Sequence, residues 1–295
     1  DEQHRFGVHQ RLALRQKGEQ QDILPHQLVM TATPIPRTLT MSLYADMETS
    51  VIDELPPGRS PVTTSVVADS RRGEVVERVR SACKLGAQAY WVCTLIEESE
   101  VLQCQAAEAT ADQLGQVLPE LTTGLIHGRM TSSEKTRVMN DFKAGKIDLL
   151  VATTVIEVGV DVPNATLMII ENPERLGLAQ LHQLRGRIGR GTDQSHCVLL
   201  YHPPLGAISK QRLNVLREST DGFYIAEQDL QIRGPGELLG SRQSGNLQFR
   251  VADIIRDNHM LRDVQSVAID LLANHRDQAR AIMQRWLTNE ELGQV

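Results

Sequence analysis

Residues 147–161 carry the sequence IDLLVATTVIEVGVD. Its first half is a short apolar run typical of a buried strand, and it passes directly into two threonines, a glycine and an aspartate. Segments with helical periodicity separate it from further strand-type runs, which lie at 62–67, 89–96, 123–126, 166–170 and 196–201. Strands that alternate with helices predict an α/β fold, with a parallel sheet covered by helices on both faces.

Some of the predicted helices have explicit start and stop signals. Residues 131–134 read TSSE, which is the spacing of a capping box, and they open a predicted helix that ends at Gly145. The helix predicted over 72–85 is followed by Gly86 as a stop residue.

Changes in composition divide the chain into three regions. Residues 1–57 resemble fragments of an α/β unit and end in the linker-type sequence LPPG at 55–58. The regular strand–helix alternation occupies 58–205. Residues 206–295 are predicted to be mainly helical, with a glycine-rich loop over 234–245.

Composition excludes several classes of protein. With 41% hydrophobic and 23% charged residues, the chain can bury a core and is not intrinsically disordered. No apolar run approaches the ~20 residues of a membrane span. The four cysteines form no CxxC pair, which favours reduced thiols in a cytoplasmic protein. The net charge of −6 excludes nucleic-acid binding by bulk positive charge, although a local basic patch could still bind it.

The chain opens with a pair of acidic residues, Asp1 and Glu2, followed by Gln3 and His4. Adjacent carboxylates at a strand end suit nucleotide hydrolysis, because one can bind Mg²⁺ while its neighbour activates the attacking water. Taken alone, such a pair is more often part of a solvated surface.

The strand that ends at residue 152 leads to a second candidate site. The hydroxyl groups of Thr153 and Thr154 can bond a nucleic-acid backbone phosphate, and Asp161 can accept a hydrogen bond from a ribose hydroxyl. The alternative is that the two threonines only cap the helical turn that follows.

The third candidate site is rich in arginine. Between Arg175 and Arg190 there are four arginines and no acidic residue. Arg187 and Arg190 are spaced to project from one face of a helix, where two guanidinium groups can clamp phosphate oxygens. A solvated basic helix is the alternative. Gly186 and Gly189 count against it, because glycine weakens a helix by ~1 kcal/mol.

These motifs, in this order, resemble motifs II, III, V and VI of superfamily 2 helicases. The segments at 6–8, 31–38, 50–59, 126–130 and 229–245 narrow the resemblance to the RecG family, which remodels stalled forks and branched DNA. The related transcription-repair coupling factor shares the segment after the motor. The resemblance implies a RecA-like, P-loop NTPase-like second motor domain over 58–205, preceded by a remnant of the first motor domain and followed by a translocation module.

The resemblance also implies residue roles. Asp1 would bind Mg²⁺ and Glu2 would activate water, while coupling of nucleotide to DNA would involve His4, Thr31 and Thr33. DNA contact would involve Thr153, Thr154 and Arg129, and the nucleotide would lie near Gly159 and Asp161. Catalytic arginines would be Arg187 and Arg190, positioned by Gln183. The residues that transmit closure of the motor to the translocation loop would be Arg233, Arg242 and Gln243.

One departure from the family pattern limits the activity expected of the chain. The phosphate-binding pattern GxxxxGK[ST], the wedge domain and most of the first motor domain are absent from the sequence. We therefore expect the C-terminal part of a longer bacterial protein, inactive alone, that uses ATP and Mg²⁺ on branched or duplex DNA. The alternatives are a non-catalytic DNA- or partner-binding module, or a duplex translocase of the coupling-factor type.

Overall fold

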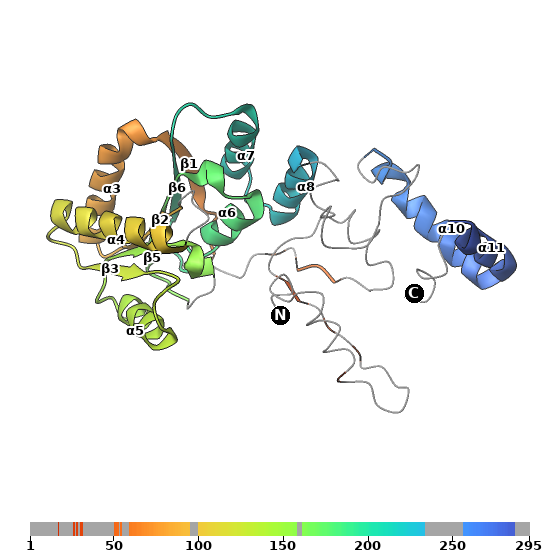
Figure 1. Ribbon diagram of the computed structural model, residues 1–295, viewed down its shortest axis with the longest axis horizontal. Helices are drawn as coiled ribbons and strands as arrows, with labels where there is room; N and C mark the ends of the chain where they lie inside the picture. The colour runs from red at the N-terminus through yellow and green to blue at the C-terminus, as the bar shows by residue number, and fades with distance from the viewer. Residues whose placement is uncertain are drawn as a thin grey trace. The chain divides into compact units, whose positions relative to one another are not determined.

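The computed structural model describes residues 59–94, 100–157, 161–233 and 256–286, together with a few isolated positions before residue 59. The chain divides into two compact units, with the boundary between Ile232 and Arg233. The first unit holds the strands that the structure describes, and the second holds the terminal helices (Figure 1).

The first unit is built on a parallel sheet, as predicted. Within the described residues, six strands lie in the order β1-β6-β5-β2-β4-β3, and every neighbouring pair is parallel. Their bounds are β1 Thr63–Ala68, β2 Gln88–Cys93, β3 Thr123–Ile126, β4 Leu149–Ala152, β5 Ala165–Glu171 and β6 His196–Tyr201. The interior strands β2 and β4 are buried along their whole length, which explains why they form unbroken apolar runs.

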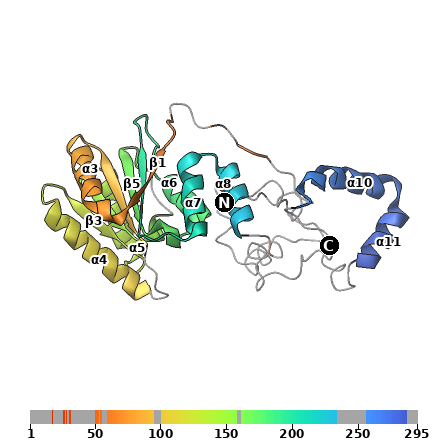
Figure 2. The same cartoon turned by 90° about the horizontal axis from the view of Figure 1, so that it is seen from above.

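Helices cover both faces of this sheet (Figures 1 and 2). Side chains from α3 and α4 pack on one face, and side chains from α5, α6, α7 and α8 pack on the other. Their bounds are α3 Arg72–Lys84, α4 Glu100–Val117, α5 Ser132–Lys143, α6 Leu178–Arg185, α7 Ala207–Glu218 and α8 Gly222–Arg233. Short 3-10 helices are η2 Asp69–Arg71, η3 Thr154–Glu157 and η4 Pro173–Arg175.

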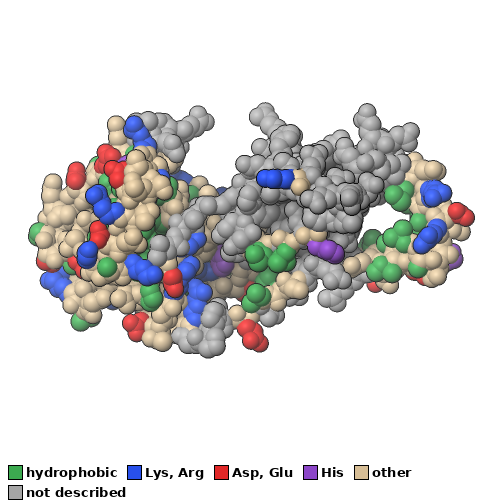
Figure 3. Space-filling view, turned by 90° about the horizontal axis from the view of Figure 1, so that it is seen from below, with side chains coloured by type: hydrophobic (Ala, Val, Ile, Leu, Met, Phe, Trp, Pro, Cys, Tyr) green, Lys and Arg blue, Asp and Glu red, His purple; other side chains and the backbone are tan. Residues whose placement is uncertain are grey.

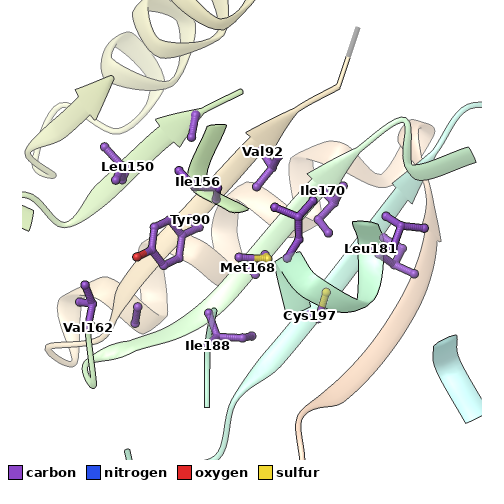
Figure 4. Packing of buried hydrophobic residues seen from close by; sticks show 14 of the residues in the cluster. Tyr90, Val92, Leu150, Ile156, Val162, Met168, Ile170, Leu181, Ile188 and Cys197 are labelled. Atoms are coloured by element: carbon purple, nitrogen blue, oxygen red, sulfur yellow. The ribbon is translucent and has the colours of Figure 1, made fainter. Parts of the chain in front are cut away.

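The two cores follow from the alternation of side chains along β2. Trp91 is fully buried among side chains of α3 and α4, whereas its neighbours Tyr90 and Val92 belong to the core on the opposite face. The Tyr90 ring lies 4.9 Å from that of Phe142 on α5. Figure 4 shows Tyr90 and Val92 on β2 together with Met168 and Ile170 on β5. This second core lies directly beneath the candidate site described below.

Local signals in the sequence are confirmed at several helix ends. The Thr131 hydroxyl accepts a hydrogen bond from the Glu134 amide, and the Glu134 carboxylate accepts one from the Thr131 amide, so the capping box is present. Gly86 follows α3 with a φ of +93°. β2 is shorter than predicted and ends at Cys93, and the hydroxyl of the next residue, Thr94, donates to the carbonyl of Glu171.

The second unit contains η5 Asn258–Met260 and the neighbouring helices α10 Leu261–Asn274 and α11 Arg276–Trp286. Apolar side chains on α10 are exposed, among them Val264, Val267 and Leu272. Among the helices that the structure describes, none is both long and apolar enough to cross a membrane.

Candidate functional site

The predicted helix through Arg187 and Arg190 is wrong: α6 ends at Arg185. Residues 186–190, here called the arginine loop, follow it as irregular backbone. Gly189 has a φ of +71°, in the left-handed region that favours glycine. A Cβ at Gly189 would also lie 2.8 Å from Cγ2 of Val62. Both constraints require glycine at position 189, which supports the close packing that the glycines predicted.

The loop brings together two of the predicted site residues. Nη1 of Arg190 lies 3.5 Å from Oδ1 of Asp161, although the two are far apart in the sequence. Nε of Arg190 donates to the carbonyl of Gly186 at 3.4 Å. The side chains of Arg190 and Asp161 keep 30% and 57% of their surface exposed. The side chain of Arg190 is therefore partly exposed to solvent and is not enclosed within its own domain.

Arg187 belongs to the same charged cluster and is half-buried. Burial raises the pKa of Tyr90 to about 12, and the positive charges of Arg187 and Arg190 oppose that rise. The phenol end of Tyr90, on β2, therefore lies within electrostatic reach of both arginines. A set of paired guanidinium groups with a nearby carboxylate can bind an anion with several oxygens, such as a phosphate chain.

The structure adds one residue that the sequence reasoning missed. Nε of Arg59 donates to the carbonyl of Gly189 at 2.8 Å, and Nη2 donates to that of Gly186 at 3.5 Å. Burial lowers the pKa of Arg59, the charge of Arg190 lowers it further, and Asp161 opposes both. The sequence offered no signal for this contact, because Arg59 lies more than a hundred residues before the loop.

Arg185, one of the four arginines between positions 175 and 190, is buried and faces inward. Its Nη1 donates to the carbonyls of Leu216 and Ser219, each at 2.8 Å, and to the hydroxyl of Thr64 at 3.3 Å. Burial lowers its pKa. This arginine therefore joins the end of α6 to the end of α7 and is not available to a ligand.

His182 completes this buried cluster. Its Nδ1 lies 3.0 Å from Nη2 of Arg185, and arginine can only donate, so Nδ1 accepts and the proton resides on Nε2. Burial, and then the charge of Arg185, lower the pKa of His182 to about 4, whereas Asp221 acts in the opposite direction. The folded chain therefore holds this imidazole neutral.

This neutral histidine predicts a pH dependence of stability. The unfolded chain protonates His182 near its ordinary pKa of 6.5, whereas the folded chain does so only near 4. The contribution of His182 is therefore fully present above about pH 6.5 and is lost as the pH falls toward 4, by about 3 kcal/mol at most. Urea unfolding at pH 5 and pH 7.5 measures it, with His182→Gln as the control that cannot titrate. Equal pH dependence in the two chains would contradict this prediction.

The predicted DNA-contacting residues lie at the carboxyl ends of the neighbouring strands β3 and β4. Thr153 follows β4, is buried, and donates its amide to the carbonyl of Ile126 at 3.2 Å. Thr154 opens η3, and Arg129, after β3, is exposed. The structure thus brings these three residues to one edge of the sheet, while DNA contact itself stays a prediction. Basic and acidic side chains are interspersed on the face of the first unit in Figure 3.

The structure describes three further residues of the predicted site, one of them in its backbone alone. Gln183 lies on α6 and is half-buried, and Thr31 is half-buried as well. Arg233 ends α8, but its side chain lies outside the described residues. The remaining predicted residues lie outside the described part of the chain: Asp1, Glu2, His4, Thr33, Gly159, Arg242 and Gln243.

The fold agrees with matches to known families. Residues 76–192 match the helicase conserved C-terminal domain. Together with the parallel sheet and its covering helices, this match gives the first unit the RecA-like fold of a helicase C-terminal domain. Residues 219–289 match the C-terminal part of domain 3 of the ATP-dependent DNA helicase RecG.

Proteins that match nearly the whole chain narrow the comparison to one family. The ATP-dependent DNA helicase RecG of Escherichia coli is 65% identical over 292 residues, which are 99% of this chain and 42% of that protein. The RecG of Pasteurella multocida is 62% identical over 293 residues, again 99% of this chain and 42% of the relative. A solved structure of RecG bound to a three-way DNA junction shares 44% identity with a TM-score of 0.65, and covers 88% of this chain and 32% of that one.

The chain corresponds to the C-terminal region of the RecG helicases. It spans less than half the length of the relatives named above.

Proposed function

We propose that this chain supplies the second motor domain and the translocation module of an ATP-dependent DNA helicase that remodels branched DNA. The observation that carries the proposal is the partly exposed side chain of Arg190 beside Asp161, in a chain 65% identical to the RecG of Escherichia coli. A guanidinium group is always charged and presents donors in a fork that matches phosphate oxygens. Arg187 and Arg190 would therefore hold the terminal phosphates of ATP.

The residues of this chain fit only part of an ATP site. The two arginines suit a triphosphate, but the sequence carries no GxxxxGK[ST] cradle for the β- and γ-phosphates. In the longer protein, ATP would supply the energy for movement, and closure against the first motor domain would complete the site. Gln183 would orient the arginines, and Gly159 and Asp161 would lie near the nucleotide.

The remnant of the first motor domain would contribute the acidic pair. Asp1 would bind Mg²⁺ and Glu2 would orient the attacking water, because adjacent carboxylates suit these two tasks. His4, Thr31 and Thr33 would couple the nucleotide state to the DNA.

The DNA-facing side would use the edge formed by β3 and β4. Thr153, Thr154 and Arg129 would contact backbone phosphates, which suits a motor that moves along DNA without reading its sequence. Movement of the second motor domain would be transmitted through the buried contact of Arg185 with the end of α7. It would continue along α8 to Arg233, and then to the predicted transmitters Arg242 and Gln243.

A three-way DNA junction tests the proposal directly. The full-length protein is expected to separate strands of a labelled junction only when ATP and Mg²⁺ are present, and to hydrolyse ATP faster when the junction is added. The 295-residue chain alone is expected to show no hydrolysis above background, because it lacks the phosphate cradle. A full-length protein that leaves the junction unchanged would contradict the proposed function. Hydrolysis of ATP by the isolated chain would contradict the prediction that the ATP site is formed jointly with the first motor domain.

A further inference from the structure

The segment that leads into β1 is hydrogen-bonded to the arginine loop. Nε of Arg59 donates to the carbonyl of Gly189 at 2.8 Å, and Nη2 of Arg59 donates to the carbonyl of Gly186 at 3.5 Å. The two acceptors belong to the first and fourth residues of the loop. The guanidinium group of Arg59 therefore connects the first and fourth residues of the loop through their backbone carbonyls.

The same segment makes two further contacts beside Arg59. The Cα of Gly189 approaches Val62 so closely that a Cβ would lie 2.8 Å from Cγ2 of that valine. The amide of Thr63 donates to the carbonyl of Ser195 at 2.9 Å, just beyond the loop. The contact of Arg59 is thus part of a continuous packing of this segment along the loop.

The carbonyl of Gly186 links Arg59 to Arg190. It accepts from Nη2 of Arg59 at 3.5 Å and from Nε of Arg190 at 3.4 Å. Two like charges repel each other, and the charge of Arg190 accordingly lowers the pKa of Arg59. Asp161 opposes this effect, and the carbonyl of Gly186 accepts from both guanidinium groups, so Arg59 and Arg190 are bonded to the same point of the loop.

We propose that Arg59 is a positioning residue, which holds the arginine loop in the shape that presents Arg190 to the nucleotide. The proposal rests on the proposed function, because it assigns Arg190 to ATP. Arg59 directs Nε and Nη2 to backbone carbonyls, and so its effect on turnover passes through the loop.

Steady-state ATP hydrolysis by the full-length protein on junction DNA tests this role. Arg59→Ala is expected to lower kcat by about 10- to 100-fold, because small displacements of a positioned group are costly. KM for ATP is expected to stay within about 2-fold of wild type. Arg59→Lys, which can still donate to Gly189, is expected to recover most of the loss. Arg71→Ala, which removes an exposed arginine paired with Glu74, is the control.

Combining variants separates positioning from direct contact. If Arg59 acts through the loop, Arg59→Ala adds nothing to the loss already caused by Arg190→Ala. A double variant whose loss is the product of the two single losses would overturn the proposal. So would wild-type kcat in Arg59→Ala.

Hydrogen exchange of the loop amides gives a readout that does not depend on activity. In the full-length protein without nucleotide, Arg59→Ala is expected to speed exchange across the loop by about 10-fold, while Arg71→Ala leaves it unchanged. Normal turnover in Arg190→Ala would contradict the proposed function. Faster exchange in Arg59→Ala would, even then, support Arg59 as the residue that holds the loop. Unchanged exchange in Arg59→Ala would overturn the positioning role even if Arg190 proves essential.

Discussion

Replacing Arg190 by alanine in the full-length protein is expected to lower the kcat of DNA-stimulated ATP hydrolysis by about 10³-fold, the lower end of the range for arginines that stabilise a transferring phosphoryl group. The side chain is exposed to solvent, and its pairing with Asp161 at 3.5 Å is long. An exposed pair of this kind contributes little to stability, so the folded structure should survive the change. The loss should therefore appear in turnover and not in folding.

Two matched variants make this result specific. Arg190→Lys keeps the positive charge but lacks the planar fork, and it is expected to recover only part of the rate. Arg217→Ala removes another exposed arginine, on α7, whose partner is the adjacent Glu218 at 3.4 Å, and it should behave as wild type. The measurement is kcat and KM for ATP with and without junction DNA. Turnover within about 3-fold of wild type in Arg190→Ala would exclude the assignment.

The sheet could be predicted from the sequence because its interior strands β2 and β4 are buried on both faces. Such strands must be apolar at every position, and so residues 149–152 stand out without reference to any partner. The Thr131 capping box and the Gly86 stop are equally local, since each signal lies within a few residues of the helix end that it marks. For features of this kind, the sequence signal lies at the same place in the chain as the feature itself.

The roles of the arginines could not be separated in the same way. Arg185, Arg187 and Arg190 follow one another in a single short stretch, yet the first is buried and the last is exposed. That difference depends on the carbonyls at the end of α7, which come from a distant part of the sequence. Gly189 packs closely against Val62, as the glycines predicted, but α6 ends at Arg185, and so the predicted helical face through Arg187 and Arg190 does not form. Arg59 was missed because nothing near it in the sequence marks its acceptors.

The buried Arg185 leads to a second large effect, on stability. Arg185→Ala is expected to lower the free energy of unfolding by about 4 kcal/mol, because a buried polar group left without its partner costs about 1–3 kcal/mol. The groups that would lose their donor are the carbonyls of Leu216 and Ser219 and the hydroxyl of Thr64. Urea unfolding of the chain, followed by circular dichroism at pH 7.5, measures the change.

The geometry of the contact predicts which replacements restore stability. One guanidinium group donates through Nη1 to two carbonyls at the end of α7 and through Nη2 to His182. A lysine ammonium at this position has the charge but not the planar fork, and so Arg185→Lys should recover less than half of the loss. If Arg185→Ala were as stable as Arg71→Ala, the end of α7 would not depend on this arginine. The arginine loop and the helices after it would then need another physical link.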